Sequence, residues 1–468
     1  MIGSSTHDRI RARLSPANSL TVTLICILPL SACATTATSA PAIGSPQGGH
    51  ASGLAAAAPP NDAAAGLEAK SLDRRAYVRA VLARNPSIES ARQGWRAALA
   101  RARKAGVWED PMVDLAVAPL SIGSSQAPLG YELGISQHVP WFGKRALESS
   151  AAQAEAEASK SDYEAMRREL ALTAVTLYDQ YFVSTRSLDV NQKHVELMRV
   201  MRDSATAQFE AGHGTAQDPL QAEAELAHME HDSALLSSQR DVTVAQMNEL
   251  LHRAPELPLP PPPAELPMPA VPVASEAERL ESNALAQRSE IAAARQRAQA
   301  AQALAERADR DAYPDLTVST SYNSMWDMPE HRWMVGLGFS LPIASERRLG
   351  AADESRALRA QFESEAARLS DAARTQVYVA LKQLQESEHV LGLFEKRLLP
   401  LGRQQIDAAR ASFTTSHTSF MSVIAAEKNL RSVELEYQTA RAECDRHRAE
   451  LDRALGRIPG LDEPERRR

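Results

Sequence analysis

The sequence predicts a mainly α-helical protein in which very long helices carry a pair of β-hairpins. Aromatic residues make up only 5% of the 468 residues, while Ala, Leu, Glu, Gln and Arg dominate, a composition typical of long helices. Four short stretches alternate between apolar and polar residues, as strands do, and they lie in two pairs. The two halves of the chain also match each other, so helices and hairpins are each expected twice.

The start of the chain is predicted to be an export signal covering residues 1–32. A basic segment precedes the apolar stretch 19–32, which is too short to span a membrane. This stretch ends in Leu-Ser-Ala-Cys, which resembles a bacterial lipobox, so we expect Cys33 to be acylated and to anchor the chain in a membrane. Residues 33–70 contain mainly small residues and proline and are expected to be a flexible tether. A plain secretory signal is the alternative.

Charge and cysteine content exclude several classes of function. The formal net charge of −7 argues against nucleic acid as a partner. Beyond the signal and the lipobox only Cys444 remains, so the mature chain has no intrachain disulfide, and this residue is expected in the core. No G-x-S-x-G, H-E-x-x-H or Gly-rich phosphate loop occurs in the sequence. We therefore predict that the chain is not an enzyme and needs no cofactor.

An internal duplication defines the domain organisation. The stretch "NPSIESARQ" (85–93) matches "RSEIAAARQ" (288–296), an offset of about 203 residues. Prolines between the halves favour an extended polyproline connector. The predicted segments after the tether are a first repeat (71–253), the connector (254–273), a second repeat (274–458) and a disordered tail (459–468).

Each repeat is expected to contain the same elements in the same order. At 1.5 Å per residue, a helix of about seventy residues spans about 100 Å, which no compact globule of this size contains. The expected elements are a helix (74–106 and 276–310), two strands (about 111–122 and 130–140, then about 314–323 and 331–342), a very long helix (143–211 and 344–413) and a returning helix (218–253 and 420–456).

Each predicted strand has one apolar face and one small or polar face. In "WMVGLGFSL" (333–341), Trp333, Val335 and Leu337 alternate with smaller residues. The apolar face either packs on a partner sheet in a soluble sandwich or faces lipid in an outer-membrane barrel, and the export signal favours the barrel. Four strands cannot close a barrel, and lipid does not tolerate an open edge, so several copies are expected to share one barrel.

These features together resemble the TolC family of outer-membrane efflux channels over nearly all of residues 72–458. The resemblance rests on the duplicated plan and on "QHVPWFGKR" (137–145), "FEAGHGTAQDPLQAEAEL" (209–226) and "FTTSHTSFMSVIAAEKNL" (413–430). It implies a homotrimer with a shared twelve-stranded transmembrane β-barrel and a periplasmic α-barrel of long helices. It also implies a periplasmic adaptor protein and an inner-membrane pump of the resistance-nodulation-division (RND) type as partners.

The resemblance implies an outer membrane location, with a lipid-anchored chain extending into the periplasm. Its Trp-Phe-Gly-Lys stretch is most similar to the branch that serves heavy-metal exporters, so heavy-metal cations are the expected cargo. Multidrug or small organic toxicant efflux is the alternative. A structural coiled-coil envelope lipoprotein is a further hypothesis, and the four alternating strands argue against it.

The turns between the long and returning helices are predicted to be the periplasmic tips and the aperture. Asp218 precedes a proline, as a helix N-cap does, and matches the aspartate of the family's tip motif, while Ser422 takes its place in the second repeat. The family's paired gate aspartates are replaced by Ser422 and Ala425, so that gate is not carried over. His213 and His417 are equivalent, and in a trimer they would suit metal passage or a pH-sensitive aperture. The alternative is that these histidines are exposed turn residues that meet the adaptor.

A corner is predicted where the second strand becomes the first very long helix. Cations at a helix N-terminus oppose the helix dipole, so they are expected to have compensating partners, either phosphate headgroups or local ion pairs. The equivalent stretch 340–350 keeps a proline and two arginines but lacks Trp-Phe-Gly, so the first corner is expected to make a contact of its own. The corner residues are Pro140, Trp141, Phe142, Gly143, Lys144 and Arg145.

Overall fold

A computed structural model describes most of the chain after the predicted tether. It covers residues 70–123, 125, 128–267, 271–272, 276–414 and 419–462. All of these belong to one compact unit that begins at Ala57. The predicted signal peptide, Cys33, nearly all of the tether, His417 and residues 463–468 lie outside the described residues.

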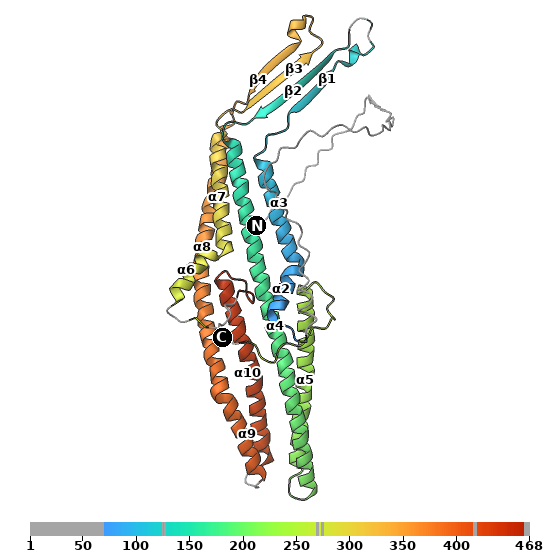
Figure 1. Ribbon diagram of the computed structural model, residues 1–468, viewed down its shortest axis with the longest axis vertical. Coiled ribbons are helices and arrows are strands. Elements are labelled where there is room, and N and C mark those ends of the chain that lie inside the picture. Colours follow the sequence, from blue (N-terminus) through green and yellow to red (C-terminus); the bar gives the residue numbers. More distant parts are fainter. Residues whose placement is uncertain are drawn as a thin grey trace, which may run out of the picture. The chain divides into compact units, whose positions relative to one another are not determined.

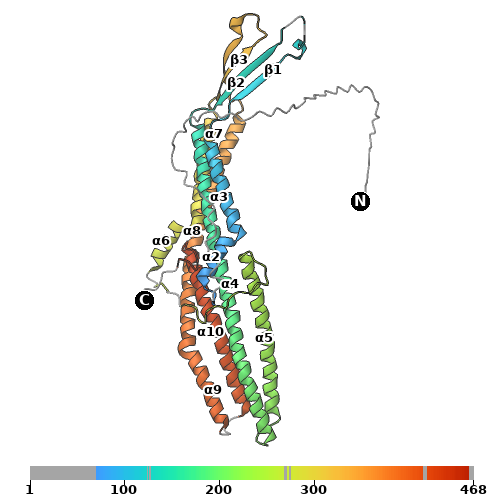
Figure 2. The same cartoon turned by 45° about the vertical axis from the view of Figure 1, so that its right-hand side comes forward.

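The first repeat follows the expected order of elements (Figure 1). The sheet lies at one end of helix α4 and the turn into helix α5 lies at the other (Figures 1 and 2). The elements are α2 (Arg74–Arg84), α3 (Pro86–Ala105), β1 (Met112–Val117), the short η1 (Pro119–Ser121), β2 (Tyr131–Val139), α4 (Lys144–Glu210) and α5 (Gln217–Leu250).

The second repeat has the same order with more interruptions. Its elements are α6 (Ala277–Gln287), α7 (Ser289–Arg310), β3 (Leu316–Asn323), the short η3 (Pro329–His331), β4 (Trp333–Phe339), α8 (Ser345–Leu393), the π-helical turn η4 (Phe394–Leu398), α9 (Leu399–Thr414) and α10 (Phe420–Ala454).

The first helix of each repeat is broken in two, where the sequence predicted one helix. Between α2 and α3, Asn85 is extended, and its side chain accepts a hydrogen bond from the Ser87 N–H at 2.9 Å while Pro86 starts the new helix. This is a standard N-cap with proline in the first turn. Arg288 is extended in the same place between α6 and α7.

The helical stretch predicted over 344–413 runs from Ser345 to Thr414 without a gap, but a π-helical turn interrupts its α-helical pattern. Pro400 lacks an N–H, and its ring would clash with the carbonyl of the residue four positions earlier in an α-helix. The π-helical turn Phe394–Leu398 lies directly before it and relieves that clash by widening the backbone locally. In contrast, α4 contains neither proline nor glycine and runs for 67 residues without a break.

The four strands form one antiparallel sheet in the order β1-β2-β3-β4, so the two hairpins join through β2 and β3. These two central strands pair from Glu132 with Asn323 to Val139 with Leu316. Strands β1 and β4 form the two edges, and neither edge is paired within the described part of the chain.

The register confirms the predicted alternation along the strands. Residues that share a face include Val113, Leu115, Val117, Leu133, Ile135, Val139, Leu316, Val318, Val335, Leu337 and Phe339 on the apolar side. The opposite side includes Asp114, Ala116, Glu132, Gly134, Ser136, His138, Thr317, Ser319, Ser321, Gly336 and Gly338. Apart from the half-buried Val139 and Leu316, these apolar side chains are exposed on this chain, so nothing in the described fold covers most of that face.

The helices pack around α4, which contacts α3, α5, α7 and α10 along its length. A mid-length core contains Tyr77, Tyr178 and Phe182, and a second core near the α4–α5 turn contains Met198 and Ile424. None of the helices in the described part of the chain combines the length and the apolarity that a bilayer crossing requires.

The proline-rich connector is held against α4 and α10 by its carbonyl groups, because proline has no N–H to donate. The Tyr181 hydroxyl donates to the Pro260 carbonyl at 3.1 Å, and Arg441 donates to the Leu266 carbonyl at 2.6 Å. Near the C-terminus, Pro459 and Gly460 are buried, so the start of the predicted disordered tail is part of the packed fold.

Candidate functional site

The predicted corner is the place where strand β2 turns into α4. Pro140 follows the last residue of β2, and α4 begins at Lys144. Between them Gly143 has a φ of +84°, a conformation that favours glycine. A Cβ atom at this position would also collide with the guanidinium of Arg310. A cavity of about 460 Å³ lies beside the corner, between it and Gly106 and Trp108.

Lys144 is buried and is held by the segment 311–315 between α7 and β3 of the other repeat. Its Nζ donates to Asp315 Oδ1 at 2.9 Å and lies 3.1 Å from Asp311 Oδ1. It also donates to the Tyr313 carbonyl at 3.3 Å. These acceptors offset the unfavourable helix dipole at this position. The local ion pair, not a phosphate headgroup, is therefore the partner of Lys144 that the structure shows.

Asp315 is the acidic residue that ties this corner together. Its Oδ1 atom accepts hydrogen bonds from Lys144 Nζ and, at 2.7 Å, from the Trp141 N–H. Burial alone would raise the pKa of Asp315, but these two hydrogen bonds outweigh it and lower the pKa below its ordinary value. The carboxylate therefore stays charged at neutral pH and holds both the start of α4 and the backbone of the corner.

The aromatic residues of the corner have different environments. The Trp141 ring stacks on the Tyr313 ring, with centroids 5.4 Å apart and planes 7° from parallel. The Phe142 ring meets Trp141 edge-on but is 79% exposed. Trp141 therefore makes the specific contact that was expected only at the first corner, and its partner is an aromatic residue of the second repeat.

Arg145 connects the same corner to the segment 106–111, between α3 and β1 of its own repeat. Its guanidinium lies 4.0 Å from the centre of the Trp108 ring, and it donates to the Gly106 carbonyl at 2.6 Å. A cation over an indole face is attracted by the ring quadrupole. The first corner therefore contacts both segments that lead from a helix into a hairpin.

The equivalent corner of the second repeat lacks such contacts. Leu341 and Ile343 are 76% and 90% exposed. With Pro140 aligned on Pro342, Glu346 takes the place of Lys144, and the next residue, Arg347, makes no hydrogen bond or ion pair with any residue that the structure describes. The Nε atom of Arg348 is buried and has no hydrogen-bond partner among these residues.

The polar face of the sheet carries a shallow pocket of about 250 Å³. Asp114 and Glu132 line it together with serines of β2 and β3. Glu132 Oε2 accepts a hydrogen bond from Asn323 Nδ2 at 3.1 Å, across the junction of the two hairpins. This face offers hydrated carboxylates and hydroxyls, as expected of a surface that borders water.

In the turn between α4 and α5, the prediction that Asp218 is the helix N-cap is wrong. Asp218 is the second residue of α5, and Ala216 occupies the N-cap position. The Asp218 carboxylate instead accepts a hydrogen bond from the Thr215 N–H at 3.0 Å and so ties the turn from inside the helix. In the second repeat Ser419 is the N-cap residue, and Ser422 Oγ lies 3.2 Å from its hydroxyl.

The structure describes only one of the two predicted tip histidines. His213 is exposed in the turn after α4, and His417 lies outside the described residues. No group of three or more His, Cys, Asp or Glu side chains in the described ranges is placed to hold a metal ion. Cys444 is buried as predicted, and burial raises the pKa of its thiol to about 11.

A buried charged cluster between helices α4 and α10 was not predicted from the sequence. His194 of α4 lies between two carboxylates of α10, with Nδ1 bonded to Glu427 and Nε2 3.1 Å from Glu434 Oε2. Burial alone would lower the pKa of His194, but the bonds to Glu427 and Glu434 outweigh it and raise it to about 9. The histidine is therefore cationic at neutral pH and joins the two repeats near the tips.

A second ionic contact lies beside this cluster. Glu225 of α5 is buried, and its carboxylate lies 2.8 Å from Lys428 Nζ and 3.8 Å from Arg431 of α10. The sequence signal for both contacts was a glutamate at an apolar position of a helix, since Glu427 follows Phe420, Val423 and Ile424 at core spacing. Such a residue requires a buried partner.

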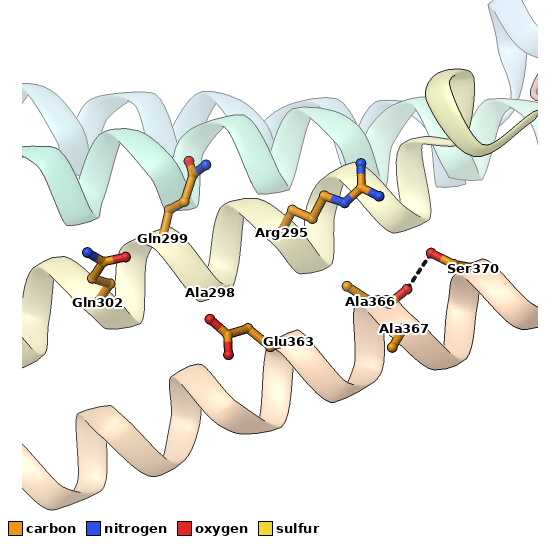
Figure 3. A pocket seen from close by; sticks show the side chains of 8 residues that line it. All are labelled: Arg295, Ala298, Gln299, Gln302, Glu363, Ala366, Ala367 and Ser370. Carbon is orange, nitrogen blue, oxygen red and sulfur yellow. Dashed lines mark hydrogen bonds between the residues drawn. The ribbon is translucent and has the colours of Figure 1, made fainter. Parts of the chain in front are cut away.

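Helices α7 and α8 border an open groove of about 440 Å³ (Figure 3). In Figure 3, Arg295 and Gln299 point away from α8, whereas Glu363 points toward α7. The Ser370 hydroxyl donates to the Ala366 carbonyl of its own helix at 2.7 Å. The polar groups do not converge on one point, so we assign no ligand to this groove.

Comparison with known proteins agrees with this geometry. The family model described as outer membrane efflux protein matches residues 77–252 and 280–457, which are the two repeats. The chain belongs to the outer membrane efflux protein family. The predicted resemblance is therefore confirmed at the level of the family. Members of this family are passive channels of the outer membrane, so the prediction that the chain is not an enzyme is also confirmed.

Solved structures of channels share the fold of this family member. The outer-membrane channel OprN is 21% identical, with a TM-score of 0.65 over 81% of this chain and 89% of its own. The structure of CusC, described in terms of folding and transmembrane channel formation, is 17% identical, with a TM-score of 0.71 over 84% and 94%. The open state of the Neisseria gonorrhoeae MtrE outer membrane channel is 18% identical, with a TM-score of 0.68 over 83% and 89%. No curated protein matches the sequence.

Proposed function

We propose that this family member is the outer membrane channel of a tripartite efflux system and acts as a homotrimer. Three copies would contribute four strands each to a twelve-stranded barrel, with the long helices extending into the periplasm. There they would meet an adaptor protein and an inner-membrane RND pump. The observation that carries the proposal is the uncovered sheet, apolar on one face and polar on the other, at the end of a 67-residue helix.

The physical chemistry of the sheet supports a shared barrel. A lipid-facing strand needs apolar side chains outside and tolerates polar ones toward a water-filled lumen. An isolated four-stranded sheet would leave the edges β1 and β4 unpaired in lipid, which is costly for every free N–H and carbonyl. Pairing with other copies removes both edges at once, and the family resemblance supports three copies.

The proposed conduction is passive. Asp114, Glu132 and His138 share the polar face, which would line the lumen and keep it hydrated. Energy and selection would come from the inner-membrane pump. The ionic contacts around His194 and Glu225 join α4 and α5 of the first repeat to α10 of the second near the tips, where a channel of this kind would narrow.

Heavy-metal cations are the proposed cargo, and small organic toxicants are the second candidate. The support for metal is the Trp-Phe-Gly-Lys corner, with its resemblance to the metal-exporting branch, and the exposed His213 near the tip. We also propose that Cys33 is acylated, on the lipobox-like sequence alone. Neither the proposed metal cargo nor the proposed acylation rests on a ligand site in the described residues.

A conductance measurement tests the channel itself. The purified full-length protein, inserted into a planar bilayer, is expected to give discrete current steps without any nucleotide or pump. A matched sample heated past its melting temperature is the control for detergent leaks. If the native protein gives no steps while an established porin does under the same conditions, the channel proposal is wrong.

The cargo and the anchor are tested in cells. In a host without its own channels, the chain with its adaptor and pump is expected to raise resistance to copper, silver or zinc salts and not to dyes or detergents. The opposite pattern would replace metal by organic toxicants. For the anchor, labelled palmitate is expected to enter the wild type and not Cys33→Ala, and equal labelling would contradict acylation at this residue.

A further inference from the structure

The helix ends that adjoin the sheet are basic, whatever the direction of the helix. Helices α3 and α7 end next to the sheet, and α4 and α8 begin there (Figure 1). The terminal turns at these four ends contain two carboxylates, Asp309 and Glu346. Each of the four turns carries two cations: Arg103 and Lys104 in α3, Arg307 and Arg310 in α7, Lys144 and Arg145 in α4, and Arg347 and Arg348 in α8.

The helix dipole does not account for this pattern. Cations stabilise the C-terminal ends of α3 and α7, but they oppose the dipole at the N-terminal ends of α4 and α8. At the opposite end of the long helices, the last turns of α4 and α9 contain no basic residue, and the first turn of α5 contains Asp218. The four basic ends share only their position beside the sheet, so a negatively charged surface is expected at that level.

We propose that the cavity at the first corner binds the phosphate group of an anionic membrane phospholipid. In this site Arg145 binds the phosphate from the cavity wall, and Arg310 adds a second positive charge beside Gly143. The inference rests on the proposed position of the sheet in the membrane and names a ligand for the level at which the sheet leaves it. The ion pair of Lys144 with Asp315 fixes the corner, and the neighbouring cations are left for the lipid.

Arg145 lines this cavity, whose volume of about 460 Å³ lies within the range of small-molecule sites. Its guanidinium lies over the Trp108 ring and donates to the Gly106 carbonyl, but it forms no ion pair with a carboxylate in the described part of the chain. Its Nε atom is buried and has no hydrogen-bond partner there. A buried donor without an acceptor is costly, and phosphate oxygens match the geometry of a guanidinium.

Arg310 is a second cation without a partner at this corner. Its guanidinium fills the space that a side chain at Gly143 would take, and Gly143 itself lines the cavity. The side chain of Arg310 makes no hydrogen bond or ion pair with any residue that the structure describes. The two carboxylates that flank it in the chain, Asp309 and Asp311, both pair with other cations. The charge of Arg310 is therefore available to an external anion.

Aromatic rings form much of the cavity wall. Trp108, Trp141 and Phe142 line it, and Trp108 and Phe142 are 51% and 79% exposed. Indole rings are enriched at membrane–water interfaces, at the level of the lipid headgroups. Glu109 and Asp110 follow Trp108 in the chain but do not line the cavity. The cavity therefore offers a cation for the phosphate and an apolar wall for the glycerol region of a phospholipid.

Lipid binding by the purified full-length protein tests the site. In native mass spectrometry from mixed micelles with equal amounts of phosphatidylglycerol and phosphatidylcholine, the wild type is expected to retain mainly phosphatidylglycerol. Arg310→Gln should weaken phosphatidylglycerol binding about fivefold, the usual effect of one cation near an anionic surface. The matched control Arg199→Gln removes the same charge near the other end of α4, where Arg199 pairs with Glu230, and should leave lipid binding unchanged.

Two further changes separate lipid binding from folding. Phe142→Ala removes a largely exposed ring, so it should weaken phosphatidylglycerol binding while the melting temperature without added lipid stays near that of the wild type. Arg145→Gln should lower phosphatidylglycerol binding to the level of phosphatidylcholine, and Arg145→Lys should restore most of it because the charge is kept. A purely structural role of these residues would change the melting temperature and leave the lipid preference unchanged.

The outcomes separate this inference from the proposed function. Equal retention of both lipids by the wild type, or unchanged binding in Arg310→Gln or Phe142→Ala, would overturn the inference. Displacement of phosphatidylglycerol by excess inorganic phosphate, but not by sodium chloride at the same ionic strength, would assign the site to small anions and also overturn it. Current steps in the bilayer without a lipid preference would overturn this inference alone. A lipid preference without current steps would overturn the proposed channel and support the lipid site.

Discussion

At the first corner, Lys144 and Trp141 are held by Asp315 and Tyr313 of the other repeat, whereas at the second corner the equivalent Glu346 and Ile343 are exposed. Both corners turn a strand into a long helix, and both place a cation at the start of that helix. The difference lies in the strand that lies beside each corner. Strand β3 supplies a linker beside the first corner, and the described chain supplies no strand beyond β4.

This comparison shows that the two repeats share an order of elements but not their contacts. Within the chain, the contact joins the first repeat to the second. At the second corner the side chains are different: Glu346 replaces Lys144, and Ile343 replaces Trp141. The following experiments alter one corner and compare the effect with the same change at the other.

The largest effect is expected for Lys144→Met. The substitution leaves the half-buried Asp311 and Asp315 beside an apolar side chain, which should cost about 3 kcal/mol, the low end for a broken buried ion pair. Arg347→Met removes a cation without a partner among the described residues and should lower the melting temperature in detergent much less. Adding Asp315→Asn to Lys144→Met should recover part of the loss, because the uncompensated charge is removed. Equal melting shifts for the two single variants would contradict the asymmetry.

The next effect concerns the aromatic stack. Trp141→Ala removes a half-buried indole from the Tyr313 ring and should cost about 2–3 kcal/mol. Phe142→Ala alters a side chain that is 79% exposed and should cost less than about 0.5 kcal/mol. Circular dichroism melts of both variants provide the measurement. A Phe142→Ala variant that is the less stable of the two would show that Phe142, not Trp141, carries the corner.

At the other end of the long helices, His194 of the first repeat contacts Glu427 and Glu434 of the second. His194 has a pKa near 9 in the fold, above its ordinary value of 6.5. Its raised pKa stabilises the fold fully below about pH 6.5, and this stabilisation is lost as the pH rises through 9. The loss should be on the order of 2 kcal/mol, seen as a falling melting temperature between pH 6.5 and 9.5. His194→Gln should flatten this profile, and an unchanged slope would exclude His194 as its source.

The smallest effect is expected for Gly143→Ala. A side chain at φ +84° is strained and displaces Arg310, at a cost of about 1–2 kcal/mol. Gly350 lies inside α8 with open space around it, so Gly350→Ala should instead stabilise the protein by about 0.5–1 kcal/mol. Thermal melts in one detergent compare the two. Opposite signs are expected, and a stabilising Gly143→Ala would show that the corner does not need glycine.

The sequence was sufficient for features that depend on local pattern. The alternation in 131–139 and 333–341 predicted the two faces of the sheet, and the repeat offset predicted which elements correspond. The break at Asn85 and Pro86 and the π-helical turn before Pro400 were missed, although both prolines were visible, because helical periodicity continues across them.

Contacts between residues far apart in the chain could not be predicted from the sequence. Asp315 lies 171 residues after Lys144, and Glu427 lies 233 residues after His194. Nothing in the local sequence distinguishes these carboxylates from the many solvated ones. The cation at the helix start did show that a partner was needed, and a glutamate at a core position shows the same. The identity of each partner required the packing of one repeat against the other.

The most direct test of the proposed assembly is the mass of the intact protein extracted from membranes, measured by native mass spectrometry in a mild detergent. The account predicts three copies of the chain in one particle, because only shared strands close the sheet. Arg359→Glu, which breaks only the ion pair of Arg359 with Glu363 within α8, should give the same mass. A particle that contains a single copy, stable in the same detergent and still active in the bilayer measurement, would contradict the shared barrel.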